Sequence, residues 1–195
     1  SQRALAPALE LDASLARAHV EWALTAEGLG VEPALINAPY QLGARLAPDD
    51  ARTQTLAAAW AARQGDVERA LEGYDRALRV DPKLVDAWCR RADLLAQKGG
   101  AAGALASYQR ALDVDRKSIP ALIGLADVAE RSGAKDVAER SLRALVDQFP
   151  DAPLYRTRLI EFFRRTHQTT KAAQAQKELE RLQPRDTRHL RALRK

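Results

Sequence analysis

The sequence predicts an all-α protein, a solenoid of helix-turn-helix repeats, and three observations lead to this prediction. Ala and Leu, which lose little entropy in a helix, account for 39 and 27 of the 195 residues. Ile, Val and Thr together number only 21, too few for the buried strands of a parallel sheet. In addition, the same residue types recur every 34 positions, which is typical of helical hairpins stacked in a row.

The 34-residue period holds in several registers at once. A turn glycine recurs at Gly65, Gly99 and Gly133, and His167 takes the fourth place. Other registers repeat a small residue, a large residue or a proline: Ala70, Ala104, Ala138 and Ala172; Tyr74, Tyr108, Leu142 and Gln176; Pro48, Pro82, Pro150 and Pro184, with Arg116 in the remaining slot. Because the registers keep step over four copies, we interpret each copy as one structural unit.

Within a copy, the apolar spacing predicts two helices. Trp88, Ala92 and Leu95 lie on one helical face, and Gly99 ends that helix. A second stripe contains Tyr108, and the proline slot closes the second helix because Pro cannot continue it. The expected helices are residues 16–28, 38–46, 51–63, 67–80, 85–97, 101–114, 119–131, 135–148, 153–165 and 169–182.

The two ends of the chain depart from the pattern. Residues 1–12 match only the second helix of a copy, and the copy at 16–50 is degenerate, with Pro39 inside its second helix. An interior Pro costs about 3 kcal/mol, so we expect it to kink that helix or to delay its start to about Asn37. Residues 185–195 are expected to form a short capping helix.

These registers resemble the tetratricopeptide repeat, which has a bulky residue early in the first helix, small residues at the helix crossing, an aromatic residue in the second helix and a proline at its end. The best match is the copy at 85–118, and the resemblance covers nearly the whole chain as a single domain, 1–195. The further copies are 51–84, 119–152 and 153–184. The resemblance implies a right-handed superhelix whose first helices line a groove, and a role as a protein–protein interaction scaffold.

The groove side of the first helices is the candidate partner-binding surface. It carries an acidic row beside a basic row, made of Arg63, Arg90, Asp93, Asp127, Arg131, Arg158, Glu161, Arg164 and Arg165. Asp127–Arg131 and Glu161–Arg165 are i,i+4 pairs that could satisfy each other, at about 0.2–0.5 kcal/mol each, without any ligand. The alternative is that the arginines bind the carboxylates of a polar peptide.

The charge distribution favours an acidic protein partner at the C-terminal half of the groove. The chain has a formal charge of +5, and residues 151–195 alone carry 12 basic and 5 acidic side chains, a net +7. Such an excess steers acidic surfaces toward it. Nucleic-acid binding through the same end is the alternative, but the stacking platform that single strands favour is missing.

Family members that bind chaperone tails hold a C-terminal carboxylate with a Lys/Asn clamp. The positions similar to that clamp hold Thr55, Cys89, Ile123 and Thr157, without a lysine, so the sequence disfavours a chaperone adaptor.

The sequence contains no catalytic or metal-binding motif. His19, His167 and His189 are scattered, and the single cysteine, Cys89, has no His at helical spacing to activate it. No P-loop or GxGxxG motif occurs. We therefore expect no enzyme activity, no cofactor and no metal. Acidic residues one repeat apart stand on helices about 8–10 Å apart, too far to bind the same metal ion at distances of about 2.0–2.6 Å.

The setting of the protein is only partly indicated. A single cysteine excludes an intramolecular disulfide and leaves the periplasm and the cytoplasm equally open. The richness in Ala and Arg suggests a bacterial genome. The chain starts at Ser1 and has no Met, which indicates a segment of a larger tetratricopeptide protein, for which the resemblance implies a place in a bacterial assembly such as an envelope or secretion system.

Overall fold

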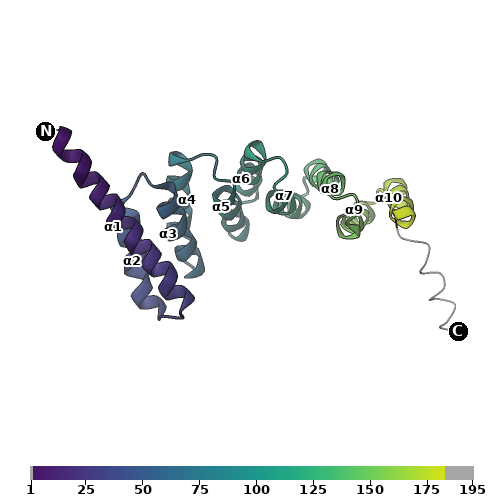
Figure 1. Ribbon diagram of the computed structural model, residues 1–195. Helices are drawn as coiled ribbons and strands as arrows, with labels where there is room; N and C mark the ends of the chain where they lie inside the picture. Colours follow the sequence, from purple (N-terminus) through teal and green to yellow (C-terminus); the bar gives the residue numbers. More distant parts are fainter. Residues whose placement is uncertain (1, 183–195) are drawn as a thin grey trace. The chain divides into compact units, whose positions relative to one another are not determined.

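The computed structural model describes residues 2–182, with side chains from residue 14 onward, and every element in this part of the chain is an α-helix (Figure 1). The chain divides into two compact units, Ser1–Arg116 and Lys117–Lys195. The capping helix expected at residues 185–195 lies outside the described residues.

The first unit contains six helices that form three hairpins. They are α1 (Gln2–Gly28), α2 (Pro33–Leu46), α3 (Ala51–Arg63), α4 (Val67–Val80), α5 (Val85–Gln97) and α6 (Ala101–Val114). Each helix packs against the next, and α3 also contacts α1 and α5. Thus α1, α3 and α5 form what we call the first-helix face of this unit, and α2, α4 and α6 form its second-helix face.

The second unit contains two hairpins within the described residues. Its helices are α7 (Ile119–Ser132), α8 (Lys135–Gln148), α9 (Pro153–Arg165) and α10 (Thr169–Leu182). Each packs against the next in sequence, so α7 and α9 form the first-helix face and α8 and α10 the second-helix face. From α3 to α10 the helices begin and end within one residue of the expected bounds, and the helical-repeat prediction is confirmed.

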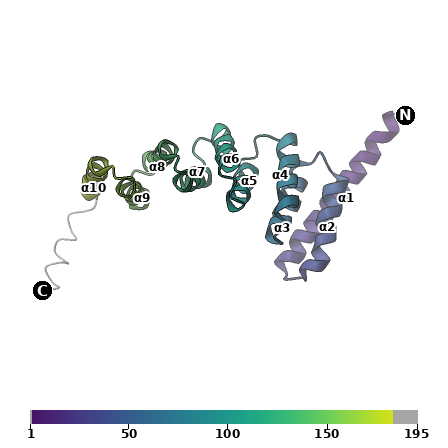
Figure 2. The same cartoon turned by 180° about the vertical axis from the view of Figure 1, so that it is seen from behind.

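The N-terminal helix differs from the expectation. The sequence predicted a separate helix in residues 1–12 and another at 16–28, but α1 is one helix of 27 residues. Asp12, Ala13 and Ser14 stand between the two expected helices, and none is the Gly or Pro that would end a helix. The N-terminal half of α1 therefore runs on past the end of α2 (Figures 1 and 2).

The start of α2 also differs from the expectation. The helix begins at Pro33 and continues through Pro39, so the start is not delayed to Asn37. Pro33 occupies the first helical turn, where a proline costs no hydrogen bond. Ile36 and Tyr40 are both almost completely buried on one face of α2, and this packing offsets the cost of the interior proline, about 3 kcal/mol.

Small residues let the helices of each hairpin cross closely. A Cβ atom added at Gly43 would lie 2.5 Å from Cγ2 of Val20, and one added at Gly73 would lie 2.8 Å from Cβ of Ala58. Contacts this short do not occur in proteins, because cores are already close-packed. The glycines are therefore required by the α1–α2 and α3–α4 crossings.

The turn between the two helices of a repeat requires a left-handed backbone. Gly65, Gly99 and Gly133 have φ angles of 80°, 80° and 78°, a region that Gly enters without steric cost. His167, in the same register, has φ of 61° and is exposed. The fourth copy therefore keeps the turn but uses a residue that is strained in it.

The aromatic register of the second helices fills the core of the first unit. Tyr74 and Tyr108 are buried, and Tyr74 packs among the small residues Ala58, Ala61 and Ala70. The hydroxyl of Tyr108 donates a hydrogen bond to Asp93 on the preceding helix. Burial raises the pKa of Tyr74 to about 12, so this phenol stays protonated and uncharged in the folded protein at neutral pH.

Three residues in the register of Trp88 donate a hydrogen bond to a backbone carbonyl at the end of the preceding repeat. The Trp88 indole donates to the carbonyl of Pro82 at 2.9 Å, and Arg156 donates to the equivalent carbonyl of Pro150 at 3.3 Å. Gln54 donates to a neighbouring helix-end carbonyl at 3.0 Å. The Pro82 and Pro150 carbonyls lie in the turn after a second helix, where no helical hydrogen bond uses them. This explains hydrogen-bonding side chains at a register where the repeat pattern expects a bulky apolar one.

Replacing Tyr108 with Ala should lower the free energy of unfolding by about 3–5 kcal/mol, because a large buried side chain leaves a cavity. Tyr108→Phe removes only the hydroxyl and should cost about 1 kcal/mol. Urea denaturation followed by circular dichroism measures both. Equal stability of Tyr108→Ala and the unchanged protein would contradict the buried position of this ring.

Replacing His167 with Gly should raise the free energy of unfolding by about 0.5–1 kcal/mol, since the relieved left-handed strain exceeds the extra entropy of the unfolded chain. The matched control is Gly133→Ala, which puts a Cβ into the same turn one repeat earlier and should destabilise by a similar amount. If both substitutions leave the denaturation midpoint unchanged, the turn does not require a positive φ.

Candidate functional site

The first-helix face of the second unit is hollowed between α7 and α9. The pocket has a volume of about 650 Å³ and includes the turn after α7. Phe162, which is buried, lies at its base. Charged side chains surround it: Asp127, Glu130, Arg131, Lys135 and Arg165. Three of the nine predicted site residues, Asp127, Arg131 and Arg165, thus line one pocket, and the assignment of these residues to partner binding stays a prediction.

Ion pairs in this pocket cross from α9 to α7. Arg165 binds the carboxylate of Glu130 at 2.5 Å, and Arg158 pairs with Asp127. The second oxygen of Glu130 lies 3.9 Å from the Arg158 guanidinium. Two arginines of one helix are therefore matched by two acids of its neighbour.

The i,i+4 pairs that the sequence allowed as one alternative do not form between side chains. Arg131 donates from Nε to the backbone carbonyl of Asp127 at 3.3 Å and not to its carboxylate, and Arg165 binds Glu130 in place of Glu161. The Glu130 side chain is only 13 % exposed, and a charge attracts its partner more strongly where water is largely excluded. The cross-helix partner is therefore preferred to the solvated one on the same helix.

Glu130 is the most enclosed acid of the pocket. Its Oε1 atom is buried and accepts no hydrogen bond from any described residue. Buried oxygens normally have a donor, and the Arg158 guanidinium lies 3.9 Å from this atom.

Arg158 depends on its acidic neighbours. Burial, and after it the repulsion of Arg165, lowers the pKa of the Arg158 guanidinium below its usual value. Arginine stays charged in proteins nonetheless. Its charge in this partly enclosed position is stabilised by Asp127 and Glu130, which leaves little of it to attract a partner.

Two cations of the pocket have no carboxylate partner among the described residues. Arg131 reaches only a backbone carbonyl, and Lys135 is exposed and makes no ion pair within residues 14–182. The other predicted residues of α9 lie outside the pocket lining. Arg158 only pairs with Asp127 beside the pocket, Arg164 donates to Gln176 at 3.4 Å, and Glu161 is exposed. The unpaired positive charge therefore sits on α7 and the start of α8.

The predicted site residues of the first unit, Arg63, Arg90 and Asp93, form ion pairs or hydrogen bonds with other residues of the chain. Arg63 binds Glu27 at 2.8 Å and lies over the Trp60 ring. Arg90 binds Asp86 at 2.7 Å, and this hydrogen bond raises the pKa of the Arg90 guanidinium. Asp93 accepts the hydrogen bond from the Tyr108 hydroxyl described above. Burial raises the pKa of the Tyr74 phenol, whereas Arg63 and Arg90 both lower it. Asp93 adds to the effect of Asp86 in raising the pKa of Arg90. The three residues therefore lie near one buried ring, and each already has a partner within the chain.

The sequence prediction missed three contributors to the pocket. Glu130 and Phe162 were visible as groove or core positions of a first helix, but only the structure shows that both border the same space. Lys135 lies beyond the turn glycine, Gly133, at the start of a second helix, so a search restricted to first helices does not include it.

Other classes of site are not evident in the described part of the chain. No group of three or more His, Cys, Asp or Glu side chains is arranged to hold a metal ion among the residues that the structure describes. No helix in the same part combines the length and apolar character needed to cross a membrane.

The fold and the charged pocket define a helical-repeat protein of the scaffold type, and the comparisons identify the family. The model of the TPR repeat matches residues 62–99, and a second model, the tetratricopeptide repeat, matches residues 95–159. The chain belongs to the tetratricopeptide repeat family. Members of this family act generally as scaffolds that bind proteins or peptides, and the chain has the repeats and the fold of such a scaffold.

Solved structures show the same fold at low sequence identity. MamA 41-end from Desulfovibrio magneticus RS-1 has a TM-score of 0.70 and 18% identity, over 86% of this chain and 94% of that one. YrrB, titled a TPR protein with an unusual peptide-binding site, has a TM-score of 0.68 and 18% identity, over 91% of both chains. Pseudomonas aeruginosa PilF has a TM-score of 0.65 and 13% identity, over 91% of this chain and 80% of that one. No relative was found among curated protein sequences.

The Glu130–Arg165 pair should couple measurably to stability. We expect Glu130→Gln to lower the free energy of unfolding by about 1 kcal/mol, because it leaves Arg165 and Arg158 with less compensating charge. A double-mutant cycle with Arg165→Gln should give a coupling energy of about 0.5–1 kcal/mol. Glu161→Gln is the control, and an equal loss in this variant would show that the cross-helix pair has no special role.

Proposed function

We propose that the chain is a scaffold whose pocket between α7 and α9 binds an acidic segment of a partner protein. The observation on which this proposal depends is the unpaired positive charge of Arg131 and Lys135 at a pocket of about 650 Å³. Both side chains are exposed, so a partner's carboxylates reach them without displacing an internal acid. Exposed cations of this kind speed association with acidic surfaces and are screened by salt.

The pocket also offers groups suited to a peptide backbone. Oε1 of Glu130 lacks a hydrogen-bond donor among the described residues, and a peptide N–H is a donor of the right kind. Phe162 borders the same space, but it is only 2% exposed, so it closes the pocket and offers little surface to a peptide side chain. Carboxylates that bind Arg131 and Lys135, with one N–H bound to Glu130, would fix both the charge and the direction of the segment.

A polypeptide fits this pocket better than a nucleic acid does. Sequence-tolerant binding of single strands uses exposed aromatic rings on which bases stack, whereas Phe162 and Phe163 are each 2% exposed. The net +7 of residues 151–195 is also partly cancelled by the cross-helix pairs of α9. The bacterial sources of the structural neighbours support our further proposal that the partner belongs to a bacterial assembly, such as an envelope or secretion system.

A displayed library of random peptides, selected on the 195-residue chain, tests the proposal. We expect the selected peptides to be rich in Asp and Glu, and their affinity to fall as salt is raised. Reversing the charge with Arg131→Glu and Lys135→Glu should weaken a selected peptide at least about tenfold, mainly through the association rate.

The matched control for this test is Arg140→Glu, an exposed arginine of α8 that does not border the pocket. It should change the affinity less than about twofold. Selection of neutral or basic peptides would contradict the proposal, and so would tighter binding of an oligonucleotide of equal charge. Equal weakening by Arg140→Glu would show that attraction to the whole surface, and not the pocket, is responsible.

A further inference from the structure

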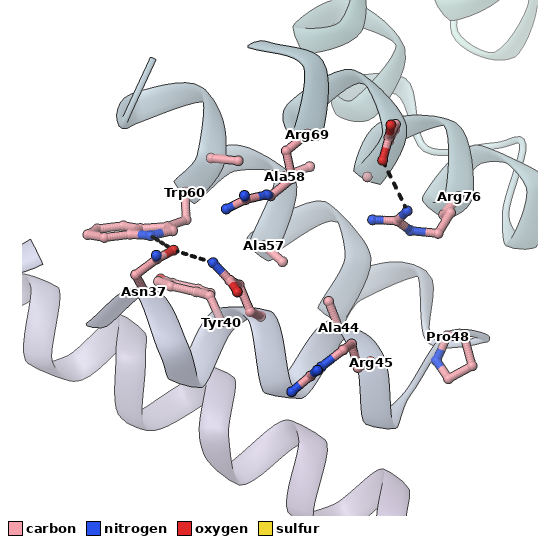
Figure 3. Close-up of a pocket in the computed structure, with 14 residues that line it drawn as sticks. Asn37, Tyr40, Ala44, Arg45, Pro48, Ala57, Ala58, Trp60, Arg69 and Arg76 are labelled. Atoms are coloured by element: carbon pink, nitrogen blue, oxygen red, sulfur yellow. Dashed lines mark hydrogen bonds and ion pairs between the residues drawn. The ribbon is translucent and has the colours of Figure 1, made fainter. Parts of the chain in front are cut away.

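A second pocket lies on the second-helix face of the first unit. It is bounded by α2, α3 and α4 and has a volume of about 440 Å³ (Figure 3). Its floor is made of small side chains, among them Ala44, Ala57 and Ala61, and three arginines stand around it. It shares no lining residue with the pocket between α7 and α9.

The next repeat shows what normally occupies this space. Arg91 stands in the register of Ala57, one period later. Its guanidinium bridges two second helices, donating to Asp75 of α4 at 2.6 Å and to Ser107 of α6 at 2.6 Å. Ala57 cannot make this bridge. The Gln54 side chain links the Ala44 carbonyl of α2 to Arg76 of α4, at 2.6 and 2.9 Å, and the space in front of Ala57 stays open.

A second register contributes to the opening. Leu95 follows Ala61 by one period, and its side chain lies close enough to α6 that a Cβ atom added at Gly103 would be 3.2 Å from it. Ala61 is too short to fill that volume, and it lines the pocket together with Arg69, which stands in the register of Gly103. The pocket therefore results from two large-to-small differences within one repeat and not from a looser arrangement of the helices, since Gly73 still brings α4 into contact with Ala58.

The rim of this pocket is positively charged. Arg45 of α2 is exposed and has no carboxylate partner among the described residues. Arg69 is also exposed and pairs only with the half-buried Asp66, at 3.2 Å. Arg76 lies 3.8 Å from Glu72. Figure 3 shows Arg45 on α2, with Arg69 and Arg76 across the opening on α4. The lining of this pocket thus contains three arginines and a single acidic residue, Glu72.

One wall is rigid and polar at its edge. Tyr40 and Trp60 stack with ring centroids 5.2 Å apart. The Trp60 indole donates to Oδ1 of Asn37 at 3.3 Å, and Gln41 donates to the same atom at 3.0 Å (Figure 3). Asn37 uses its oxygen twice, and its NH₂ group donates to no described residue. A backbone carbonyl of a bound segment is the natural acceptor for that group.

We infer that this pocket binds a partner protein through one large apolar side chain flanked by acidic residues. The apolar side chain fills the space that Arg91 and Leu95 fill in the next repeat, and the flanking carboxylates bind Arg45 and Arg69. Burial of such a side chain in a fitting cavity is the usual source of affinity at a protein interface, and the charges fix its orientation. The site is independent of the proposed function, because it lies in the other unit and on a second-helix face.

Two variants of the full 195-residue chain test the two halves of this inference. Ala57→Leu fills the cavity with the residue that two other repeats already carry in this register, Leu125 and Leu159, so it is compatible with the fold. Arg45→Glu with Arg69→Glu reverses the rim. The control is Arg79→Glu, which stands one period after Arg45 on an exposed position, in the repeat whose gap Arg91 bridges.

The probe is a fluorescein-labelled peptide, Asp-Glu-Trp-Glu-Asp, beside one with Ser in place of Trp and one with Lys in place of the acids. By fluorescence anisotropy we expect both test variants to weaken the first peptide about tenfold, and Arg79→Glu to weaken it less than about twofold. The two altered peptides should bind at least about tenfold more weakly. In ¹⁵N-resolved spectra the indole N–H of Trp60 should shift, and that of Trp88 should not.

Several results would overturn the inference. They are the absence of binding at peptide concentrations on the order of 1 mM, unchanged affinity of Ala57→Leu, and equal weakening by Arg79→Glu. Thermal denaturation shows whether Ala57→Leu is folded, and if it is not, the surface variant and the Trp60 resonance still decide the question. Because the peptide is acidic, all of these variants are made in the Arg131→Glu, Lys135→Glu background, which removes the site proposed between α7 and α9. The failure of one site is then distinguishable from the failure of the other.

Discussion

The close crossing of neighbouring helices is the constraint on which the rest of this structure depends. At Gly73 and Ala58 the backbones approach so nearly that one added carbon would collide, and Ala70, Ala104 and Ala138 are completely buried in the same way. Because cores of this density resist added volume, every repeat must keep small residues at its crossing. This requirement explains why small residues recur every 34 positions in the sequence.

Close crossing also decides how the charges are paired. Side chains of successive first helices come within reach of each other, so Arg158 and Arg165 bind acids of the preceding first helix, α7. The same principle operates on the second-helix face, where Lys171 binds Glu139 of the preceding second helix at 2.9 Å. Ion pairs thus link consecutive repeats and add to the nearest-neighbour packing that stabilises repeat proteins.

The sequence was sufficient for the fold because the fold is local. The helix ends follow from Gly at the turns and Pro after the second helices, and both signals act within a few residues. It was insufficient where several signals compete, as at Pro39, which the buried Ile36 and Tyr40 outweigh. It also could not rank Glu130 above Glu161 as the partner of Arg165, because that choice depends on burial and on the distance between helices.

Substitutions at a few repeat positions give the repeats different roles, either in linking helices or in forming a pocket, without changing the fold. Where the register of Ala57 holds Arg91, the side chain bridges two second helices; where it holds Ala57, the same space is an open pocket with a basic rim. Neither residue disturbs the helix crossing, which the glycines and alanines fix separately. Stability and recognition therefore depend on different positions of the repeat, so one can change with little cost to the other.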